Sequence, residues 1–305
     1  MSSLSSWCQW RHYFFDLPLF ALGLRLQRLE EWDRLSGDRE PLLAGVEFLR
    51  RRLGADFSSL PGEEIARRAN LVKLVRESDT YASLLINRRR LSRWFSFEGL
   101  PALCQAIQGE RPVIFLGGHL GSNYTMWIAL DRLGCTVYPV ARAVDRSPAT
   151  SRARQAYLEL TYRLTGKKWR GRYLFADAHG HFPRGQFPEM LDDVFKQGGI
   201  CFAAIDFPPT LYQGKQEKVP FLGGMTALPG HFIQLGLQRN ARFFTILEGI
   251  ELRGRQKVRR IHLQPIDLQD AAAILRVYAE RLTAFICREP WQWMGLAIAS
   301  QYDIQ

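Results

Sequence analysis

The 305-residue sequence lacks a long apolar run, and this absence bears on how the protein meets a membrane. The closest candidate, YFFDLPLFALGLRL at 13–26, is only 14 residues long and contains Asp16, Pro18 and Arg25. A membrane-spanning helix needs about 20 apolar residues, so we predict that this segment does not cross a bilayer. It does not fit a signal peptide either, because Asp16 interrupts the apolar region and no small-residue cleavage site follows.

Paired cysteines and nucleotide-binding loops are also missing. The five cysteines are odd in number and never form a CxxC pair, which argues against a disulfide framework or a zinc site and favours a reducing compartment. His179 and His181 flank a glycine without accompanying ligands, so we expect no metal. No GxGxxG or Walker loop is present, and neither hydride transfer nor nucleotide hydrolysis has support. The cysteines are Cys8, Cys104, Cys135, Cys201 and Cys287.

Lysine is scarce among the basic residues, at seven of 41, although the net charge reaches +11. Arginine suits phosphates, carboxylates and interfaces because its guanidinium is planar and weakly hydrated. The excess is compatible with nucleic acid, an anionic membrane, an acidic carrier protein or coenzyme, or simply a solvated surface. The run Arg88–Arg90 is open to two interpretations in the same way: a solvated helix end, or a contact with lipid phosphates.

The N-terminal segment is rich in aromatic and apolar residues beside Arg11 and Arg25. Such a composition suits a segment lying in the lipid headgroup layer. The alternative is a helix packed on the rest of the protein or on another subunit. The residues concerned are Trp7, Trp10, Tyr13, Phe14, Phe15, Leu17, Leu19 and Phe20.

Beyond this segment, the periodicity predicts helices from 40 to 94 and then alternating strands and helices. Such alternation indicates an α/β fold with a largely parallel central sheet covered by helices on both faces. We expect a helical N-terminal extension (1–95) that is able to associate with a membrane, joined to one α/β unit (96–305). The expected strands are 111–118, 135–142, 172–176, 199–206, 243–252 and 257–266, the last two antiparallel, and the expected helices are 122–133, 152–165, 188–198, 228–239 and 268–289.

His119 follows the first buried strand in the sequence GGHLGSNYTMW. Flanking glycines allow a sharp turn, and the helix that follows begins with unpaired N–H groups. A histidine there is placed to deprotonate a nucleophile while amides near Gly121 and Ser122 receive an oxyanion. A structural histidine is the alternative reading.

The stretch VIFLGGHLGSNYTMWIALDRLGCTVYPVAR resembles the block around the catalytic histidine of the lipid A biosynthesis (lauroyl/myristoyl) acyltransferase family and of mycobacterial phosphatidylinositol mannoside acyltransferases. The likeness continues through GGICFAAIDFPP, KVPFLGGMTALPGHFIQLGLQRNARFFTIL and REPWQWMG, and covers about 98–295. The resemblance implies a glycerolipid acyltransferase-like fold and acyl transfer from a thioester of acyl carrier protein or coenzyme A, with no tightly bound cofactor.

This chain departs from the family at the acid that orients the histidine. The family pattern is His-x4-Asp/Glu, whereas the fifth residue after His119 is Tyr124. Loss of a charged hydrogen-bond partner predicts a loss of at least about tenfold in rate if nothing replaces the acid. Three outcomes are open: Tyr124 orients His119, another acid such as Asp206 approaches, or the protein is a weakened relative. Asp206 also ends a buried strand, although it would equally suit a turn before the two prolines.

Further candidate residues surround this edge. Asn123 lies in the first turn of the expected helix. Arg142 ends the second strand and Arg146 lies in the loop after it; the resemblance implies that they hold a substrate anion, and the alternative is that they form surface ion pairs. Gly223 and Thr226 lie between a short strand and a helix and would wrap a substrate head.

Together these features predict an acyltransferase at the membrane surface that acts on a hydroxyl or amine of a lipid-like acceptor. The expected place is the cytoplasmic face of a bacterial inner membrane, with an anionic membrane surface as partner and without nucleic acid. Two rivals stay open: a non-catalytic acyl-carrier- or lipid-binding relative, and an enzyme that acylates a secondary-metabolite acceptor.

Overall fold

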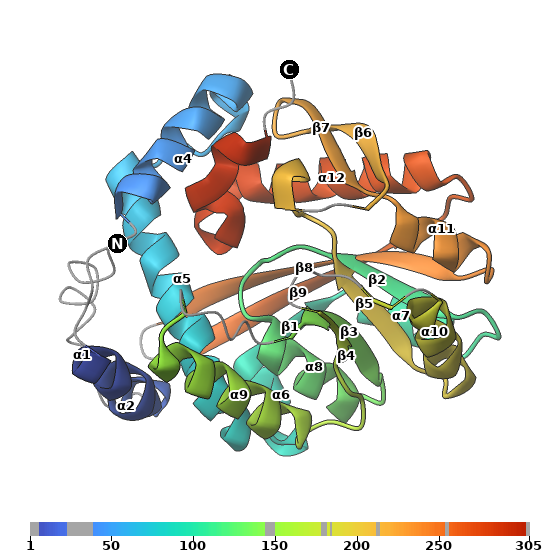
Figure 1. The fold of residues 1–305 in the computed structure, drawn as a ribbon, viewed down its shortest axis with the longest axis horizontal. Coiled ribbons are helices and arrows are strands. Elements are labelled where there is room, and N and C mark those ends of the chain that lie inside the picture. The colour runs from blue at the N-terminus through green and yellow to red at the C-terminus, as the bar shows by residue number, and fades with distance from the viewer. Residues whose placement is uncertain are drawn as a thin grey trace.

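The computed structural model describes residues 6–22, 39–143, 150–177, 182–183, 185–211, 214–253 and 256–302. Its core is a seven-stranded sheet in the order β1-β9-β8-β2-β5-β3-β4, flanked by helices (Figure 1). All neighbouring pairs are parallel except β8 and β9. The predicted α/β class with a largely parallel sheet is therefore confirmed. The strands are β1 (Phe95–Glu98), β2 (Val113–Gly117), β3 (Val137–Arg142), β4 (Leu174–Ala176), β5 (Ile200–Ala204), β8 (Arg242–Arg253) and β9 (Gln256–Ile266).

Helices cover both faces of the sheet. Alternate residues of the buried strands point toward opposite faces, so each strand contributes to both helical layers. Ile114 and Leu116 of β2 pack with the helices α4, α5, α10, α11 and α12, whereas Val113 and Phe115 pack with α6, α7 and α8. The helices are α4 (Arg39–Leu53), α5 (Gly62–Ala82), α6 (Leu91–Trp94), α7 (Leu100–Ile107), α8 (Asn123–Arg132), α9 (Arg152–Gly166), α10 (Gln186–Lys196), α11 (His231–Leu237) and α12 (Ala271–Arg288).

Two features differ from the sequence expectation. A short strand, β1, adds to the edge of the sheet, and a separate antiparallel hairpin forms from β6 (Gln216–Phe221) and β7 (Gly224–Pro229). The predicted helix from 228 was wrong in its first residues, because β7 continues to Pro229 and α11 starts only at His231. The hairpin turn places Leu222 and Gly223 at φ of 52° and 75°, the positive angles that two-residue hairpin loops require.

The N-terminal segment packs on the rest of the protein along one side. It consists of α1 (Ser6–Arg11), a π-helical stretch (His12–Asp16) and α2 (Leu17–Ala21). Tyr13 stacks on Tyr157 of α9, and Lys257 of β9 donates a hydrogen bond to the Phe20 carbonyl. One side of this segment is thus packed on the protein, as the second of the two interpretations describes.

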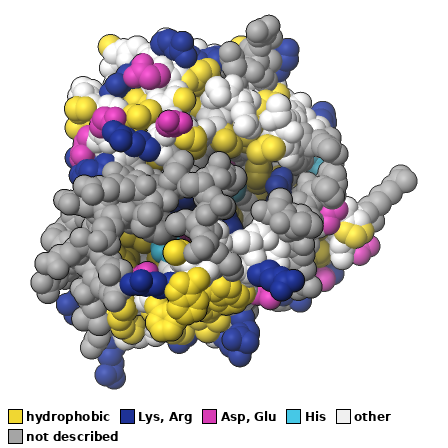
Figure 2. Space-filling model, turned by 60° about the vertical axis from the view of Figure 1, so that its left-hand side comes forward, with side chains coloured by type: hydrophobic (Ala, Val, Ile, Leu, Met, Phe, Trp, Pro, Cys, Tyr) yellow, Lys and Arg dark blue, Asp and Glu magenta, His cyan; other side chains and the backbone are white. Residues whose placement is uncertain are grey.

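The opposite side of this segment carries exposed apolar side chains. Trp7 is 71% exposed and Phe15 is 65% exposed, and Trp10 and Leu22 are also solvent-facing. Hydrophobic side chains gather low on the face of the molecule that carries this segment, with Lys and Arg side chains beside them (Figure 2). Among the described helices, none is both long and apolar enough to cross a membrane.

Candidate active site

The site lies where two neighbouring parallel strands end. Gly117 of β2 is paired with Ala204 of β5, and His119 and Asp206 each follow two residues later. Parallel strands present their carboxyl ends at one edge of a sheet, so the two side chains are brought together. The intervening Gly118 permits this approach, because a Cβ there would lie 3.1 Å from Asp206 Oδ2.

Asp206 and His119 form a two-point contact. His119 Nδ1 lies 2.6 Å from Asp206 Oδ1, and the His119 backbone amide donates to Asp206 Oδ2 at 2.8 Å. Burial by itself would raise the pKa of Asp206, but the charge of His119 and the hydrogen bonds from His119 and Trp293 hold it below its ordinary value. The carboxylate is therefore ionised at neutral pH and fixes Nδ1 as the protonated nitrogen, which leaves Nε2 as the basic one.

The C-terminal residues hold this pair in place. The indole N–H of Trp293 donates to Asp206 Oδ2 at 2.9 Å, and the Tyr302 hydroxyl donates to the Asp206 carbonyl. The backbone continues the contact: the Met294 amide donates to the His119 carbonyl at 2.9 Å, and the Gly121 amide donates to the Gln292 carbonyl at 3.0 Å.

We call residues 292–294 the C-terminal clasp. In the sequence, the resemblance carried by REPWQWMG assigns no role to Trp293. The only local signal is the aromatic content of this segment, because a buried Trp side chain needs a hydrogen-bond partner for its N–H.

The two members of the pair differ in access to solvent. The Asp206 side chain is 1% exposed, whereas the His119 side chain is 33% exposed. The ring of Phe207 packs edge-on against the imidazole at 4.9 Å, and the guanidinium of Arg142 lies 5.7 Å from the centre of the Phe207 ring. Arg142 is thus brought to the rim of the site, where it also donates a hydrogen bond to the Leu211 carbonyl.

Tyr124 is placed elsewhere. Its ring packs against Tyr162 of α9 with centroids 6.4 Å apart, and burial raises the pKa of its hydroxyl despite the nearby charges of Arg76 and Arg154. None of the contacts found for it among the described residues is with His119. Of the three outcomes left open by the missing acid, the structure brings Asp206, rather than Tyr124, against the imidazole.

The turn between His119 and α8 differs in detail from the expected oxyanion site. Because the Gly121 amide is bonded to Gln292, it is not free to receive an oxyanion in this structure. Ser122 is the buried N-cap residue of α8, and Asn123 is its half-buried first residue. The donors that remain beside His119 therefore belong to the start of α8, with its partial positive charge.

Gly223 and Thr226 do not join His119. The Thr226 hydroxyl is buried and donates to the Tyr302 carbonyl at 2.7 Å, which is a packing role. Gly223 lines an apolar pocket of about 740 Å³ between the β6–β7 hairpin, α12 and the end of α4. His119 is not among the residues that line this pocket, but its wall residue Phe221 packs edge-on against Trp293 at 6.4 Å. The rings of Phe221 and Trp293 therefore connect the pocket to the Asp206–His119 pair.

Of the predicted site residues, Arg146 lies outside the described part of the chain. His179 and His181, at which no metal was expected, lie outside it as well. Within the described part, no group of three or more His, Cys, Asp or Glu side chains is arranged to hold a metal ion. Neither the family models nor the curated proteins that were searched include a match to this chain.

Proposed function

We propose that this protein transfers a fatty acyl group from a thioester of acyl carrier protein or coenzyme A to a hydroxyl or amine of a lipid-like acceptor. The observation that carries the proposal is a half-exposed imidazole whose Nδ1 is bound by a buried, ionised carboxylate at the carboxyl edge of a parallel sheet. Such an arrangement is suited to general-base catalysis. The resemblance to the lipid A biosynthesis acyltransferases supports the choice of acyl transfer over other reactions that need a base.

The proposed reaction runs through His119 Nε2. The acceptor O–H or N–H gives its proton to Nε2 while the oxygen or nitrogen attacks the thioester carbonyl carbon. The tetrahedral intermediate then collapses, the C–S bond breaks, and the imidazolium returns the proton to the departing sulfur. Asp206 stabilises the imidazolium between these steps because its carboxylate remains ionised and lies 2.6 Å from Nδ1.

The oxyanion of that intermediate needs donors near His119. We assign this role to the amino-terminal turn of α8, including Asn123, because the Gly121 amide is already bonded to the C-terminal clasp. Arg142, beside Phe207 on the exposed rim, would face an anionic group of the donor or the acceptor.

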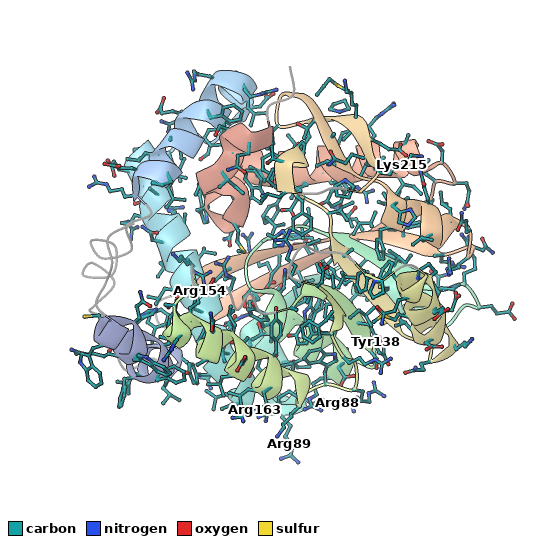
Figure 3. All side chains as sticks on the ribbon, in the orientation of Figure 1. Arg88, Arg89, Tyr138, Arg154, Arg163 and Lys215 are labelled. Carbon is teal, nitrogen blue, oxygen red and sulfur yellow. The ribbon has the colours of Figure 1, made fainter. Side chains whose placement is uncertain are left out.

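A lipid acceptor requires the site to work at a membrane surface. The exposed face of the N-terminal segment, led by Trp7 and Phe15, has the aromatic character of an interfacial anchor. Three exposed arginines lie at the lower edge of the molecule in Figure 3, namely Arg163 on α9 and Arg88 and Arg89 before α6. Arg154, which is also exposed, lies higher, at the start of α9. We propose that the side carrying these residues docks on an anionic bilayer, at the cytoplasmic face of the inner membrane.

The test is turnover with purified protein, acyl-carrier or acyl-coenzyme A donors and a panel of lipid acceptors. His119→Ala should reduce the acyl-transfer rate by about 100- to 10,000-fold. His262→Ala is the matched control, because that imidazole also has a carboxylate 2.7 Å from Nδ1, on Glu98, but lies on strand β9 away from the site.

The control variant should retain the wild-type rate. Donor binding without turnover in the wild-type protein would instead favour a non-catalytic lipid- or carrier-binding role.

A further inference from the structure

Glu248 is a buried carboxyl group that the proposed reaction does not use. It lies on β8, two residues beyond Ile246, which pairs with Gly117 at the end of β2. The residue is 1% exposed, and neither carboxyl oxygen forms a hydrogen bond of good geometry among the described residues. A buried polar group without a partner destabilises the folded state, and such groups are concentrated at functional sites.

The turn that follows His119 packs against the Glu248 side chain. A Cβ at Gly121 would lie 3.0 Å from Glu248 Cγ and 3.1 Å from the Glu248 carbonyl oxygen. Gly121 has a φ of 46°, so both its space and its backbone angle favour glycine. The neighbouring Ser122 hydroxyl is fully buried and also lacks a partner among the described residues. The backbone of the turn and the Glu248 side chain are therefore packed directly against each other.

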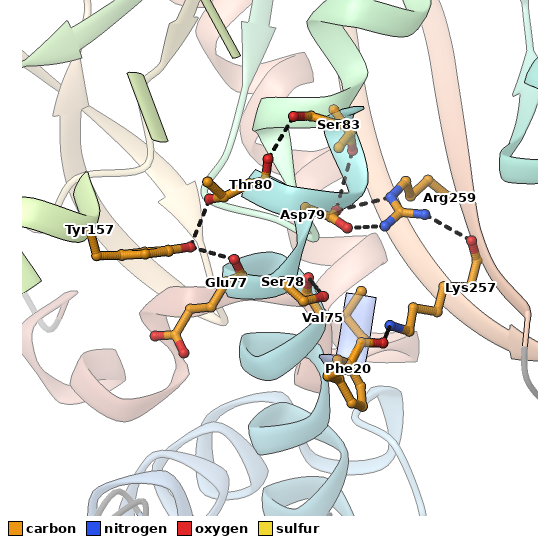
Figure 4. A network of polar contacts seen from close by, with 11 residues as sticks. Phe20, Val75, Glu77, Ser78, Asp79, Thr80, Ser83, Tyr157, Lys257 and Arg259 are labelled. Atoms are coloured by element: carbon orange, nitrogen blue, oxygen red, sulfur yellow. Dashed lines mark hydrogen bonds and ion pairs between the residues drawn. The ribbon is translucent and has the colours of Figure 1, made fainter. Parts of the chain in front are cut away.

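The charged groups facing Glu248 come from two other elements. Arg259 of β9 and Asp79 of α5 are both fully buried, and Arg259 Nε donates to Asp79 Oδ2 at 3.0 Å (Figure 4). Arg259 is thus largely neutralised by Asp79, and it does not bond to Glu248. Burial raises the pKa of Glu248 well above its ordinary value. The charge of Arg259 and the backbone N–H of Ser122 oppose the rise, and the charge of Asp79 adds to it. The carboxyl group therefore ionises less readily than that of an exposed glutamate.

We propose that Glu248, in its protonated form, is a positioning residue that holds the Gly121–Ser122 turn of the His119 site, and that its ionisation changes the conformation of this turn. The proposal rests on the proposed function where it concerns turnover. Its structural half, that the turn responds to the charge on Glu248, holds independently of the reaction.

The structural half is tested by nuclear magnetic resonance. The chain contains a single Gly-Ser dipeptide, Gly121–Ser122, so labelling with 13C-carbonyl glycine and 15N serine isolates the amide signal of Ser122. In the wild-type protein this signal should shift as pH rises through the ionisation of Glu248. In Glu248→Gln, which keeps the shape but cannot ionise, the shift should be absent. An identical titration in both proteins would overturn the proposal.

The catalytic half is tested by the pH dependence of acyl transfer. Glu248→Gln should stay within about threefold of the wild type at neutral pH. At alkaline pH the wild type should lose up to about tenfold in rate per pH unit, as expected for ionisation of one essential acid, while the variant retains its rate. Glu189→Gln, an exposed carboxyl on α10, is the control and should follow the wild type.

Glu248→Ala separates positioning from packing. It should lower kcat at every pH, whereas Glu248→Gln restores it. If Glu248→Gln loses as much rate as Glu248→Ala at neutral pH, the proposal fails. If no variant and no wild-type protein transfers acyl groups while the Ser122 titration behaves as expected, the proposed function fails and the role of Glu248 in the turn stands.

Discussion

Asp79 and Asp206 are two of the buried aspartates with basic partners, and their pairs differ in access to solvent. Asp79 and Arg259 are both fully enclosed, with Thr125 of α8 donating a further hydrogen bond to Asp79. Asp206 is enclosed to the same degree, but its partner His119 is one-third exposed. One ion pair is thus sealed from solvent, and the other is partly open to it.

A buried acid–base pair is therefore not by itself evidence of a reactive site. Solvent access distinguishes the pair that can exchange protons from the pair that stabilises the fold. Arg259 is also confined between Trp94 and Phe95, at 5.6 and 5.7 Å from their ring centres. A guanidinium does not exchange protons at neutral pH, whereas an imidazole does. The enclosed pair therefore joins α5 to the sheet, and the open pair is available for proton transfer.

Asp206→Asn should produce the largest effect on activity. The amide cannot stabilise the imidazolium, so the acyl-transfer rate should fall at least about 100-fold while the protein remains folded. Steady-state kinetics together with circular dichroism would check this. A variant with full activity would show that the open pair is architectural too, and the comparison would collapse.

The pH dependence of the free energy of unfolding provides a second test of the Asp206–His119 pair. Because the pKa of Asp206 is lowered in the folded state, its ionisation stabilises the fold above about pH 4, near the ordinary value of 3.8, and this contribution is lost as pH falls further. Denaturant unfolding at pH 7 and pH 3 should show a difference between the wild type and Asp206→Asn that shrinks at the lower pH. A difference that grows on acidification would contradict the lowered pKa.

Asp79→Asn should act on stability instead of chemistry. It leaves the charge of Arg259 buried and uncompensated, which costs about 3–5 kcal/mol in the free energy of unfolding. Asp192→Asn is the control, because Asp192 pairs with Arg239 at the surface, where such pairs contribute about 1 kcal/mol or less. Equal losses from the two variants, measured by urea denaturation, would count against the sealed pair as a structural link.

Trp293→Phe should have a smaller effect on rate. It keeps an aromatic ring in the C-terminal clasp but removes the N–H that lies 2.9 Å from Asp206. A hydrogen bond to a charged group contributes about 1.5–3 kcal/mol, so kcat should fall about 10- to 100-fold. Trp127→Phe provides the control, since that tryptophan is also buried but packs on Phe202 away from the pair. If both variants lose rate equally, the indole N–H has no special part.

Trp7→Ala should give the smallest effect, on membrane binding. Loss of about 1 kcal/mol of interfacial burial predicts about fivefold weaker binding to phosphatidylglycerol vesicles, with unchanged turnover of a soluble acceptor. Leu268→Ala, an exposed apolar residue ahead of α12, should leave vesicle binding unchanged. Sedimentation with vesicles distinguishes the two.

Much of the site could be predicted because buried parallel strands are continuous apolar runs. The apolar runs before His119 and Asp206 are recognisable in the sequence. If the two strands are parallel, as β2 and β5 are, their carboxyl ends lie at the same edge of the sheet. The contact of Trp293 with Asp206 could not be predicted in this way, since 87 residues separate them and no local pattern links them.

Two further features could not be predicted from the sequence: the β6–β7 hairpin, and the absence of a hydrogen bond of good geometry at the Glu248 carboxyl group. The hairpin turn reads as a loop before a helix, because glycines suit both. The absence of such a hydrogen bond at Glu248 is a property of the packed molecule and has no counterpart in the order of residues.

The C-terminal clasp has a consequence for how the molecule becomes active during synthesis. Its three residues are synthesised after both strands of the site, yet they fix the bend that carries the histidine. A nascent chain can form β2 and β5 early and still have an unanchored imidazole. Proteolytic removal of the chain from residue 292 onward should likewise abolish the proposed activity, although His119 and Asp206 would both remain.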